Sequence, residues 1–461
     1  MQQSNVMKVA DEQLDVQKIK EEFTVCVVGC GKMGLPTACL FAEAGFKVIG
    51  ADRNRKIVEL IKKGKSPFEE PGLEELLRKH VKGGRLTATS DTGWAVSRSD
   101  IVLVVVDTPI DEKFRPDYSR VMAACKEIGK NLRRGALVVI TSTVGPGITE
   151  TLIKETLENA SGFRAGKDFG LAFSPTLASP GRTLYDISHY ARLVAGVDSK
   201  SLKVASAVFE GVVKAGVVPL SSIKTAEAVK LFQNVYRDVN LALANEFALF
   251  CERAGIDYVE VWKAANTNPY YHFLLPGIVS GHIPKDPYLL IKEAEDLGVK
   301  LRLARLAREV NESMVVYAVE LVRDALRGCG KSLRRARVAV LGVSYKANVK
   351  EPKGSRTIKL VNLLKSKGAR VKVFDPYFDK RELVELGYPA EASLEKAVKR
   401  GDCLIIVVGH DYFRDLDLRK LKALMKVPFA IVDMGHVIDP VKAKREGIVF
   451  RGLGRGAFTE E

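Results

Sequence analysis

The sequence of 461 residues predicts an α/β protein with two Rossmann-like doubly wound domains, joined by a central helical domain that contains one long helix. Three observations predict this class. Strand-like and helical segments alternate over the first two hundred residues, the pattern from Lys224 to Arg253 is purely helical, and a second alternation begins at Arg337. The strand-like segments are almost continuously apolar, which is typical of parallel strands covered by helices on both faces.

The first strand and helix enclose a glycine-rich turn. Residues 24–28 predict a short buried strand, Gly29, Gly31 and Gly34 follow, and residues 35–44 have helical periodicity. Gly29 allows a tight turn, and Gly31 lets a pyrophosphate approach backbone N–H groups at the positive end of the helix. Gly34 allows close packing of the helix on the strand. This context predicts a dinucleotide-binding site.

The second strand, residues 47–51, ends at Asp52. A carboxylate about twenty residues beyond the glycines accepts the ribose 2′-OH of NAD and repels the 2′-phosphate of NADP. The cations that follow, Arg53, Arg55 and Lys56, leave NADP open as the alternative. We expect NAD as the cofactor.

Further buried strands are predicted at residues 101–106, 136–141 and 192–195. Polar or glycine-rich loops stand at 107–109, 142–147 and 174–176, and ligands bind at the carboxyl ends of such strands. The residues expected to contact the cofactor are Gly29, Gly31, Lys32, Met33, Gly34, Asp52, Arg53, Thr108 and Thr143.

The helix from Lys224 to Arg253 is far longer than average, which is typical of a domain connector or a dimer core, and we expect a homodimer. Another helical stretch covers residues 288–326, and the last alternation has strands near 337–342, 372–374, 403–408 and 430–433. The expected division is a polar N-terminal extension (1–22), an NAD-binding Rossmann domain (23–215), a central helical and dimerisation domain (216–328) and a C-terminal α/β domain (329–461).

Composition excludes several classes of protein. The net charge is +16, but Lys and Arg are interspersed with acids and no recognition motif accompanies them, so we expect no nucleic-acid partner. No apolar run is long enough for a membrane span and no export signal stands at the N-terminus. The seven cysteines lack C-x-x-C spacing and the six histidines lack ligand spacing, which predicts reduced thiols in the cytoplasm and no metal.

Ordered motifs along residues 23 to 455 resemble those of the UDP-glucose/GDP-mannose dehydrogenases, which oxidise the primary alcohol of a nucleotide sugar to a carboxylate with two NAD. Besides the glycine turn, they are Glu70-Pro71-Gly72-Leu73, Asp107-Thr108-Pro109, residues 142–147, Lys230 with Asn234, Asn245-Glu246, Pro284-Lys285-Asp286-Pro287 and residues 342–348. Residues 266–269 and 281–287 look most like the branch acting on UDP-N-acetylmannosamine. The resemblance implies that the C-terminal domain binds UDP.

The resemblance assigns roles to three residues. Lys230 stabilises alkoxide and oxyanion, Asn234 orients the same oxygens, and Asp286 polarises water or Lys230. Removing the first hydride needs a base but no nucleophile. Spacing alone places Lys230 and Asn234 on one helix face, where a solvated pair is the alternative explanation. Lys346 is a candidate for the sugar diphosphate or else a surface charge.

The chain departs from the family pattern at three places. His282 stands where the family has cysteine, Thr176 stands where it has glutamate, and residues 350–353 replace Asp-Asp-x-Arg. Val279 and Ser280 also replace paired glycines. The changes at positions 282 and 176 close the thioester route to the second oxidation. The imidazole of His282 either acts as a base on an aldehyde hydrate or is a hydrogen-bonded loop histidine without a catalytic role.

We therefore expect an NAD-dependent nucleotide-sugar dehydrogenase with altered chemistry. A catalytically silent paralogue that binds nucleotide sugar and NAD is the alternative, and a structural or nucleic-acid-binding protein is disfavoured. The expected catalytic residues are Lys230, Asn234, His282 and Asp286, and the expected substrate contacts are Thr176, Lys230, Asn234 and Lys346.

Overall fold

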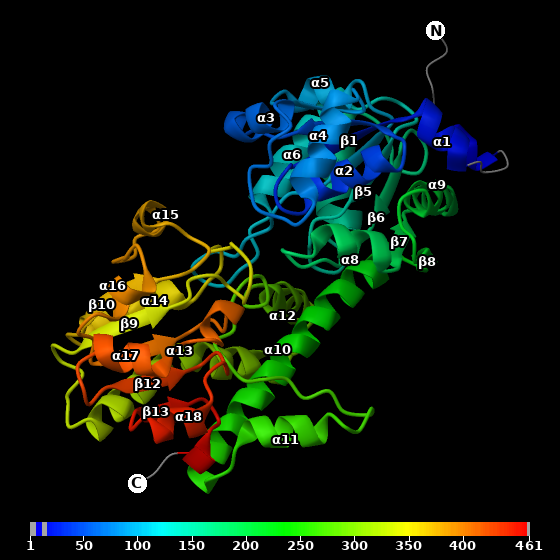
Figure 1. Ribbon diagram of the computed structural model, residues 1–461. Coiled ribbons are helices and arrows are strands. Elements are labelled where there is room, and N and C mark those ends of the chain that lie inside the picture. Colours follow the sequence, from blue (N-terminus) through cyan, green and yellow to red (C-terminus); the bar gives the residue numbers. More distant parts are fainter. Residues whose placement is uncertain (1–5, 12–15, 459–461) are drawn as a thin grey trace. The chain divides into compact units, whose positions relative to one another are not determined.

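A computed structural model describes residues 6–11 and 16–458. The chain divides into two compact units (Figure 1). The first unit comprises residues up to Gln233 together with Tyr288–Lys300, and the second comprises Asn234–Pro287 and the residues from Leu301 onward. The division falls inside the long helix α10 (Ile223–Ala254), which was predicted as residues 224–253. The three-domain division therefore stays a proposal.

The first unit contains a sheet in the order β3-β2-β1-β4-β5-β6-β7-β8. Its strands are β1 (Thr24–Val28), β2 (Lys47–Ala51), β3 (Leu86–Thr89), β4 (Ile101–Val104), β5 (Leu137–Ile140), β6 (Gly170–Phe173), β7 (Arg192–Gly196) and β8 (Val217–Pro219). β1 and β4 are neighbours, so the strand order reverses between them, as in a dinucleotide-binding fold. The predicted doubly wound class is confirmed. One pairing, β6 with β7, is antiparallel, which apolar periodicity does not reveal.

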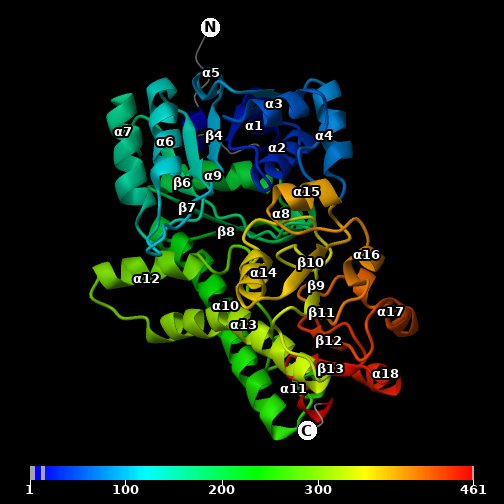
Figure 2. The same ribbon diagram turned by 90° about the vertical axis from the view of Figure 1, so that its left-hand side faces the viewer.

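Helices cover both faces of this sheet because alternate strand residues point to opposite sides. Val25 and Val27 belong to one apolar cluster, and Cys26 and Val28 to another. The first cluster includes residues of α1 (Val16–Glu22), α2 (Gly34–Glu43), α3 (Arg55–Lys62), α4 (Leu73–Lys82) and α9 (Ser199–Glu210), and α8 (Thr183–His189) packs against it. The second includes α5 (Thr92–Val96), α6 (Ser119–Asn131) and α7 (Lys154–Ser161). Figure 2 shows α6 and α7 side by side.

The N-terminal extension packs onto the first unit. Its described parts are a 3-10 helix, η1 (Val6–Asp11), and α1, and both contact α9. Val6 and Ile19 are completely buried in the first apolar cluster. The extension is therefore polar in overall composition but contributes apolar side chains to the core.

The second unit contains a parallel sheet in the order β10-β9-β11-β12-β13, coloured yellow to red in Figure 1. The strands are β9 (Arg337–Leu341), β10 (Arg370–Phe374), β11 (Cys403–Ile406), β12 (Ala430–Asp433) and β13 (Val449–Gly452). One face carries α13 (Arg302–Gly328), α14 (Thr357–Ser366) and α15 (Lys380–Glu385), and the other carries α16 (Leu394–Val398), α17 (Leu418–Leu424) and α18 (Pro440–Arg445). This order is the other common doubly wound arrangement.

The predicted helical stretch 288–326 is interrupted. It consists of α12 (Asp286–Asp296) and α13, and Gly298 between them has a φ of +75°, which ends a right-handed helix. A shorter helix, α11 (Tyr258–Ala265), follows α10. Across the described ranges, no helix is long and apolar enough to cross a membrane.

Candidate active site

The glycine turn after β1 has the geometry that a dinucleotide requires. Gly29 has a φ of +96°, and its N–H donates to the carbonyl of Ala51 at the end of β2 over 2.8 Å. A Cβ on Gly34 would overlap the carbonyl of Gly29, so the start of α2 packs directly on the turn. A Cβ on Gly31 would meet no atom within 4 Å. The open space at Gly31 fits a pyrophosphate that approaches the backbone.

Asp52 is linked to the same turn. Its Oδ2 accepts the N–H of Cys30 and its Oδ1 accepts the N–H of Asn54, each over 2.8 Å. Each carboxylate oxygen has further acceptor capacity, so the half-buried side chain remains able to bind a ribose hydroxyl. Among the other predicted cofactor contacts, Lys32 and Met33 lie in the turn, half-buried, and Arg53 is exposed.

Thr108 and Thr143 link the loops that follow β4 and β5. The buried hydroxyl of Thr108 donates to the carbonyl of Thr143 over 2.5 Å. The hydroxyl of Ser142 accepts the N–H of Val106 over 2.9 Å. These hydrogen bonds hold the two loops together at the carboxyl edge of the sheet. Contact of either threonine with the cofactor stays a prediction.

Glu227 holds the second of these loops, a role that the sequence analysis missed. This completely buried carboxylate on α10 accepts the N–H of Gly147 over 2.5 Å and that of Thr149 over 2.9 Å. Burial raises the pKa of Glu227 to about 7, although hydrogen bonds from Thr149 and Gly147 act in the opposite direction. The available signal was an acid on the apolar face of a predicted helix, three residues before Lys230.

Lys230 and Thr176 meet within the first unit. The ammonium of Lys230 donates to the carbonyl of Thr176 over 3.1 Å. On the other side, the hydroxyl of Thr176 lies 3.5 Å from a guanidinium nitrogen of Arg192. Arg192 also donates to the hydroxyl and the carbonyl of Ser174, over 2.7 and 2.9 Å, and burial lowers its pKa to about 9. Thr176 therefore lies between two cationic groups.

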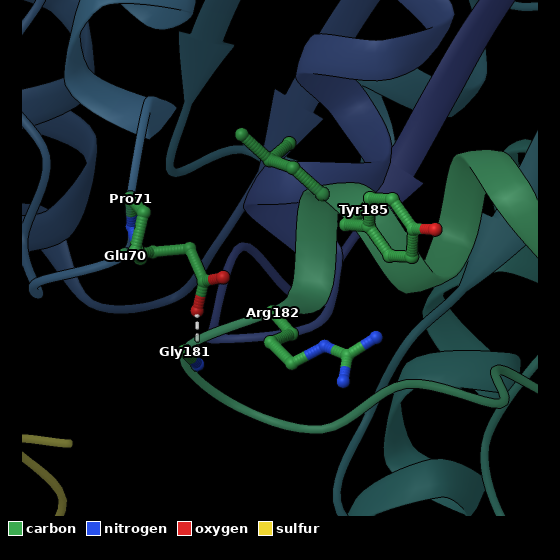
Figure 3. Close-up of a pocket in the computed structure, with 6 residues that line it drawn as sticks. Glu70, Pro71, Gly181, Arg182 and Tyr185 are labelled. Carbon is green, nitrogen blue, oxygen red and sulfur yellow. Dashed lines mark hydrogen bonds between the residues drawn. The ribbon is translucent and has the colours of Figure 1, made fainter. Parts of the chain in front are cut away.

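A cavity of about 340 Å³ lies beside the loop that carries Thr176 (Figure 3). Figure 3 shows Glu70 pointing at the backbone of Gly181, whose N–H it accepts over 2.7 Å. Glu70 also accepts the N–H of Thr183 over 2.6 Å and so caps the start of α8. Arg182 and Tyr185 line the cavity as well. The motif that begins at Glu70 thus orders the loop that follows β6.

Within the second unit, Asn234 and Asp286 are directly bonded. The side-chain amide of Asn234 donates to Oδ2 of Asp286 over 2.5 Å, and the ammonium of Lys285 donates to Oδ1 over 2.8 Å. Asp286 is 2% exposed. Lys285, which the sequence analysis did not assign, therefore balances this buried charge. Lys230 precedes Asn234 by one turn of the continuous helix α10, so both residues project from one helix face.

His282 has an exposed side chain in an anchored loop. Its carbonyl accepts the N–H groups of Lys285 and Asp286 over 3.1 and 3.3 Å, which leads the chain into α12. The preceding residue, Gly281, donates to the carbonyl of Gly354 over 3.0 Å. His282 therefore lies in a loop whose backbone is hydrogen-bonded both before it, at Gly281, and after it, at Lys285 and Asp286.

Ser280 contributes to this anchoring. Its hydroxyl accepts the N–H of Arg356 over 3.2 Å, a bond that a glycine at this position does not offer. The two segments 276–287 and 342–356 consequently lie together in the second unit. Lys346 is half-buried in the second of them, at the carboxyl end of β9, with its ammonium 5.8 Å from the ring centre of Tyr345.

These features define an oxidoreductase that uses a nicotinamide dinucleotide. Three family models match the chain in order. They describe the NAD binding domain (residues 23–213), the central domain (224–313) and the UDP binding domain (339–440) of the UDP-glucose/GDP-mannose dehydrogenase family. The chain therefore belongs to the UDP-glucose/GDP-mannose dehydrogenase family.

Individual relatives agree with this assignment. The chain is 35% identical to a UDP-N-acetyl-D-mannosamine dehydrogenase of Pyrococcus horikoshii over 94% of this chain and 99% of the relative. The structure of UDP-D-ManNAc dehydrogenase from the same organism matches with a TM-score of 0.86 and 34% identity, over 94% of this chain and all of the other. A UDP-glucose dehydrogenase of Pyrobaculum islandicum matches with a TM-score of 0.85 and 29% identity, over 96% and 100%.

The resemblance noted in the sequence is thereby confirmed. The protein is an NAD-dependent oxidoreductase that acts on a CH–OH group of a nucleotide sugar, and its C-terminal domain is a UDP-binding domain. The individual site residues remain predictions. Across the described ranges, no group of three His, Cys, Asp or Glu side chains is arranged to hold a metal ion.

Proposed function

We propose that the protein oxidises a hydroxyl of a UDP-N-acetylhexosamine and removes one hydride per sugar, with a carbonyl compound as the product. The observation that carries the proposal is the bonded pair of Asn234 and Asp286, on the same helix face as Lys230 and preceded by an imidazole at position 282. The N-acetylated sugar is suggested by the named activity of the Pyrococcus horikoshii relative.

The orientation of Asn234 follows from its partner. Because Asp286 accepts from the amide nitrogen, the amide oxygen of Asn234 faces away from Asp286. That oxygen is then available to accept the hydrogen of a substrate hydroxyl. Lys230, one turn earlier, is the ammonium that we propose stabilises the alkoxide. The hydroxyl proton then leaves to a water molecule that the carboxylate of Asp286 polarises. NAD, when bound, supplies the acceptor for the hydride.

A second oxidation through a thioester needs a thiol beside the aldehyde. None of the seven cysteines lies in residues 276–287, and all seven are buried free thiols. Position 176 carries a hydroxyl in place of a carboxylate. We therefore propose that the reaction stops after one hydride, or that any second hydride leaves from an aldehyde hydrate with His282 as the base.

The test is the stoichiometry of NADH formed per sugar consumed, measured with UDP-N-acetylmannosamine, UDP-N-acetylglucosamine and UDP-glucose. One NADH per sugar and a product trapped by hydroxylamine support the proposal. Two NADH and a uronic acid contradict the one-hydride claim, and loss of the second equivalent in His282→Ala then identifies the hydrate route. Binding of both ligands without NADH formation favours the silent paralogue.

We further propose a cytoplasmic homodimer in which a second copy of this chain covers the exposed apolar side of α10. In the second unit, Tyr236, Leu243, Phe247 and Phe250 follow one another at spacings of a helical stripe and are 38 to 64% exposed. Such an exposed apolar stripe is typical of a protein interface. The buried free thiols suit a reducing compartment.

A further inference from the structure

The two α/β sheets share one hydrogen-bonding arrangement. In each, an aspartate that follows one strand accepts backbone N–H groups from the turn after the neighbouring strand. In the first unit, Gly29 donates to the last residue of β2, and the next N–H, that of Cys30, is accepted by Asp52. Asp52 also accepts the N–H of Asn54, two residues after itself. This arrangement joins the turn after the first strand to the residue that follows the second strand.

The second unit repeats the arrangement around Asp375. Gly342 has a φ of +92° and donates to the carbonyl of Phe374 over 2.9 Å. Oδ2 of Asp375 accepts the N–H of Val343 over 2.6 Å, and Oδ1 accepts that of Tyr377 over 2.9 Å. Asp375 therefore occupies the place in its sheet that Asp52 occupies in the other.

The two aspartates differ in what surrounds them. Asp52 is half-buried, whereas Asp375 and His410 are completely buried and lie 3.1 Å apart, from Oδ2 to Nε2. Burial acts to raise the pKa of Asp375, but hydrogen bonds from His410 and from the backbone outweigh it, and the pKa lies below its ordinary value. Asp375 is thus a charged acceptor that a ribose cannot reach.

His410 joins Asp375 to the far end of the loop. Its Nδ1 accepts the N–H of Asn348 over 2.9 Å. An N–H group can only donate, so Nδ1 carries no proton and the ring proton lies on Nε2, facing Asp375. The ring of Tyr377 packs on His410 with 4.9 Å between ring centres.

Asn348 itself is in a constrained conformation. Its φ is +59°, and its side chain exchanges two hydrogen bonds with Asp411, of 2.6 and 2.9 Å. The loop 343–348 is therefore held at its start by Asp375 and at its end by His410 and Asp411. Lys346 lies between these two attachments.

We propose that Asp375 and His410 are positioning residues of the nucleotide-sugar site, which hold both ends of the loop 343–348 so that Lys346 faces the diphosphate. The proposal rests on the proposed function, in which Lys346 binds the sugar nucleotide. In this proposal, Asp52 of the first unit binds the ribose, whereas Asp375, at the equivalent position of the second unit, holds a phosphate-binding loop in place.

The test is calorimetric titration of the full chain with UDP. His410→Leu removes both hydrogen bonds of the imidazole, and we expect UDP to bind about tenfold more weakly, since the N–H of Asn348 loses its acceptor and the loop loses its attachment at that end. His410→Asn keeps an acceptor near the position of Nδ1 and should recover part of the affinity. NAD binding, which belongs to the other unit, should be unchanged in both variants and reports that the first unit is folded. Far-UV circular dichroism equal to that of the wild type reports that the second unit is folded as well.

A double-variant cycle separates positioning from general structural support. If His410 acts through Lys346, the double variant His410→Leu/Lys346→Met binds UDP no more weakly than Lys346→Met alone. Additive losses, or unchanged UDP affinity in His410→Leu, overturn the proposal.

Hydrogen exchange of the amides in 343–348 gives a reading that does not depend on a ligand. Exchange should be faster in His410→Leu than in the wild type, and equal exchange overturns the proposal. If the wild type does not bind UDP at all, the proposed function fails, and this exchange experiment alone decides whether His410 holds the end of the loop.

Discussion

The side-chain amide of Asn234 donates to the carboxylate of Asp286 over 2.5 Å, which joins the middle of α10 to the start of α12. Lys285 donates to the other carboxylate oxygen. Both oxygens of a buried acid are thus satisfied, and its charge has a partner. The pair orients Asn234 and leaves its amide oxygen for a substrate.

Asp286→Asn should lower kcat/KM for the nucleotide sugar by about 100-fold or more, within the range for loss of an acid–base group. The neutral amide no longer balances Lys285 and no longer fixes which way Asn234 points. The measurement is steady-state NADH formation. Asp296→Asn, in the exposed ion pair with Lys292 on the same helix, is the matched control and should keep its activity. Equal activity of the two variants would exclude the role of Asp286.

Asp52→Ala should reduce the preference for NAD over NADP by about 1–2 kcal/mol, since it removes hydrogen bonds to a charged acceptor and the repulsion of the 2′-phosphate. Titration with both dinucleotides measures this. Asp91→Ala removes the N-cap of α5 in the same unit without touching the glycine turn, so its selectivity should equal that of the wild type. An Asp52 variant with unchanged selectivity would refute the cofactor assignment.

Glu227 should make the stability of the protein depend on pH. Its pKa is raised from 4.5 to about 7 by burial, so the folded chain binds a proton that the unfolded chain has released between these pH values. The stability from protonated Glu227 is therefore complete below pH 4.5 and is lost as the pH rises through 7. One pKa unit corresponds to about 1.4 kcal/mol, so we expect a total loss of about 3 kcal/mol.

Denaturant unfolding of the wild type and of Glu227→Gln, followed from pH 5 to 8, tests this dependence. The amide stays neutral, so the wild type should lose stability relative to the variant as the pH rises. Glu210→Gln, at an exposed position of α9, should show no such trend. A difference between the wild type and Glu227→Gln that does not vary with pH would contradict the prediction.

The proposed dimer should dissociate when charged side chains replace residues of this apolar stripe. Burying a large apolar side chain contributes about 1.5–3 kcal/mol, so Phe247→Glu/Phe250→Glu should weaken association by more than about 100-fold. Light scattering at micromolar concentration should report a dimer for the wild type and a monomer for this variant. Val384→Glu, at an exposed apolar residue of α15, is the control. A monomeric wild type would rule out the interface.

Local patterns in the sequence were sufficient for the class of fold and for the cofactor. The glycine turn, the strand before it and Asp52 lie within about thirty residues, and backbone geometry alone links them. Strands of four or five apolar residues were also located, because burial on both faces produces uninterrupted apolar runs. The strands β3, β8 and β13 were not located, because each lies at the edge of its sheet and is only partly buried, so none of them is an uninterrupted apolar run.

The sequence by itself determined the two α/β halves, the long helix and the residue types of the proposed active site. Only the tertiary structure decided which polar groups are partners. Asp286 pairs with Lys285 and Asn234, Glu227 holds the loop at Gly147, and His410 reaches Asp375, and most of these contacts join residues separated by 35 to 80 positions. A buried polar group must find a partner wherever the chain supplies one in space, and local periodicity contains no information about that partner.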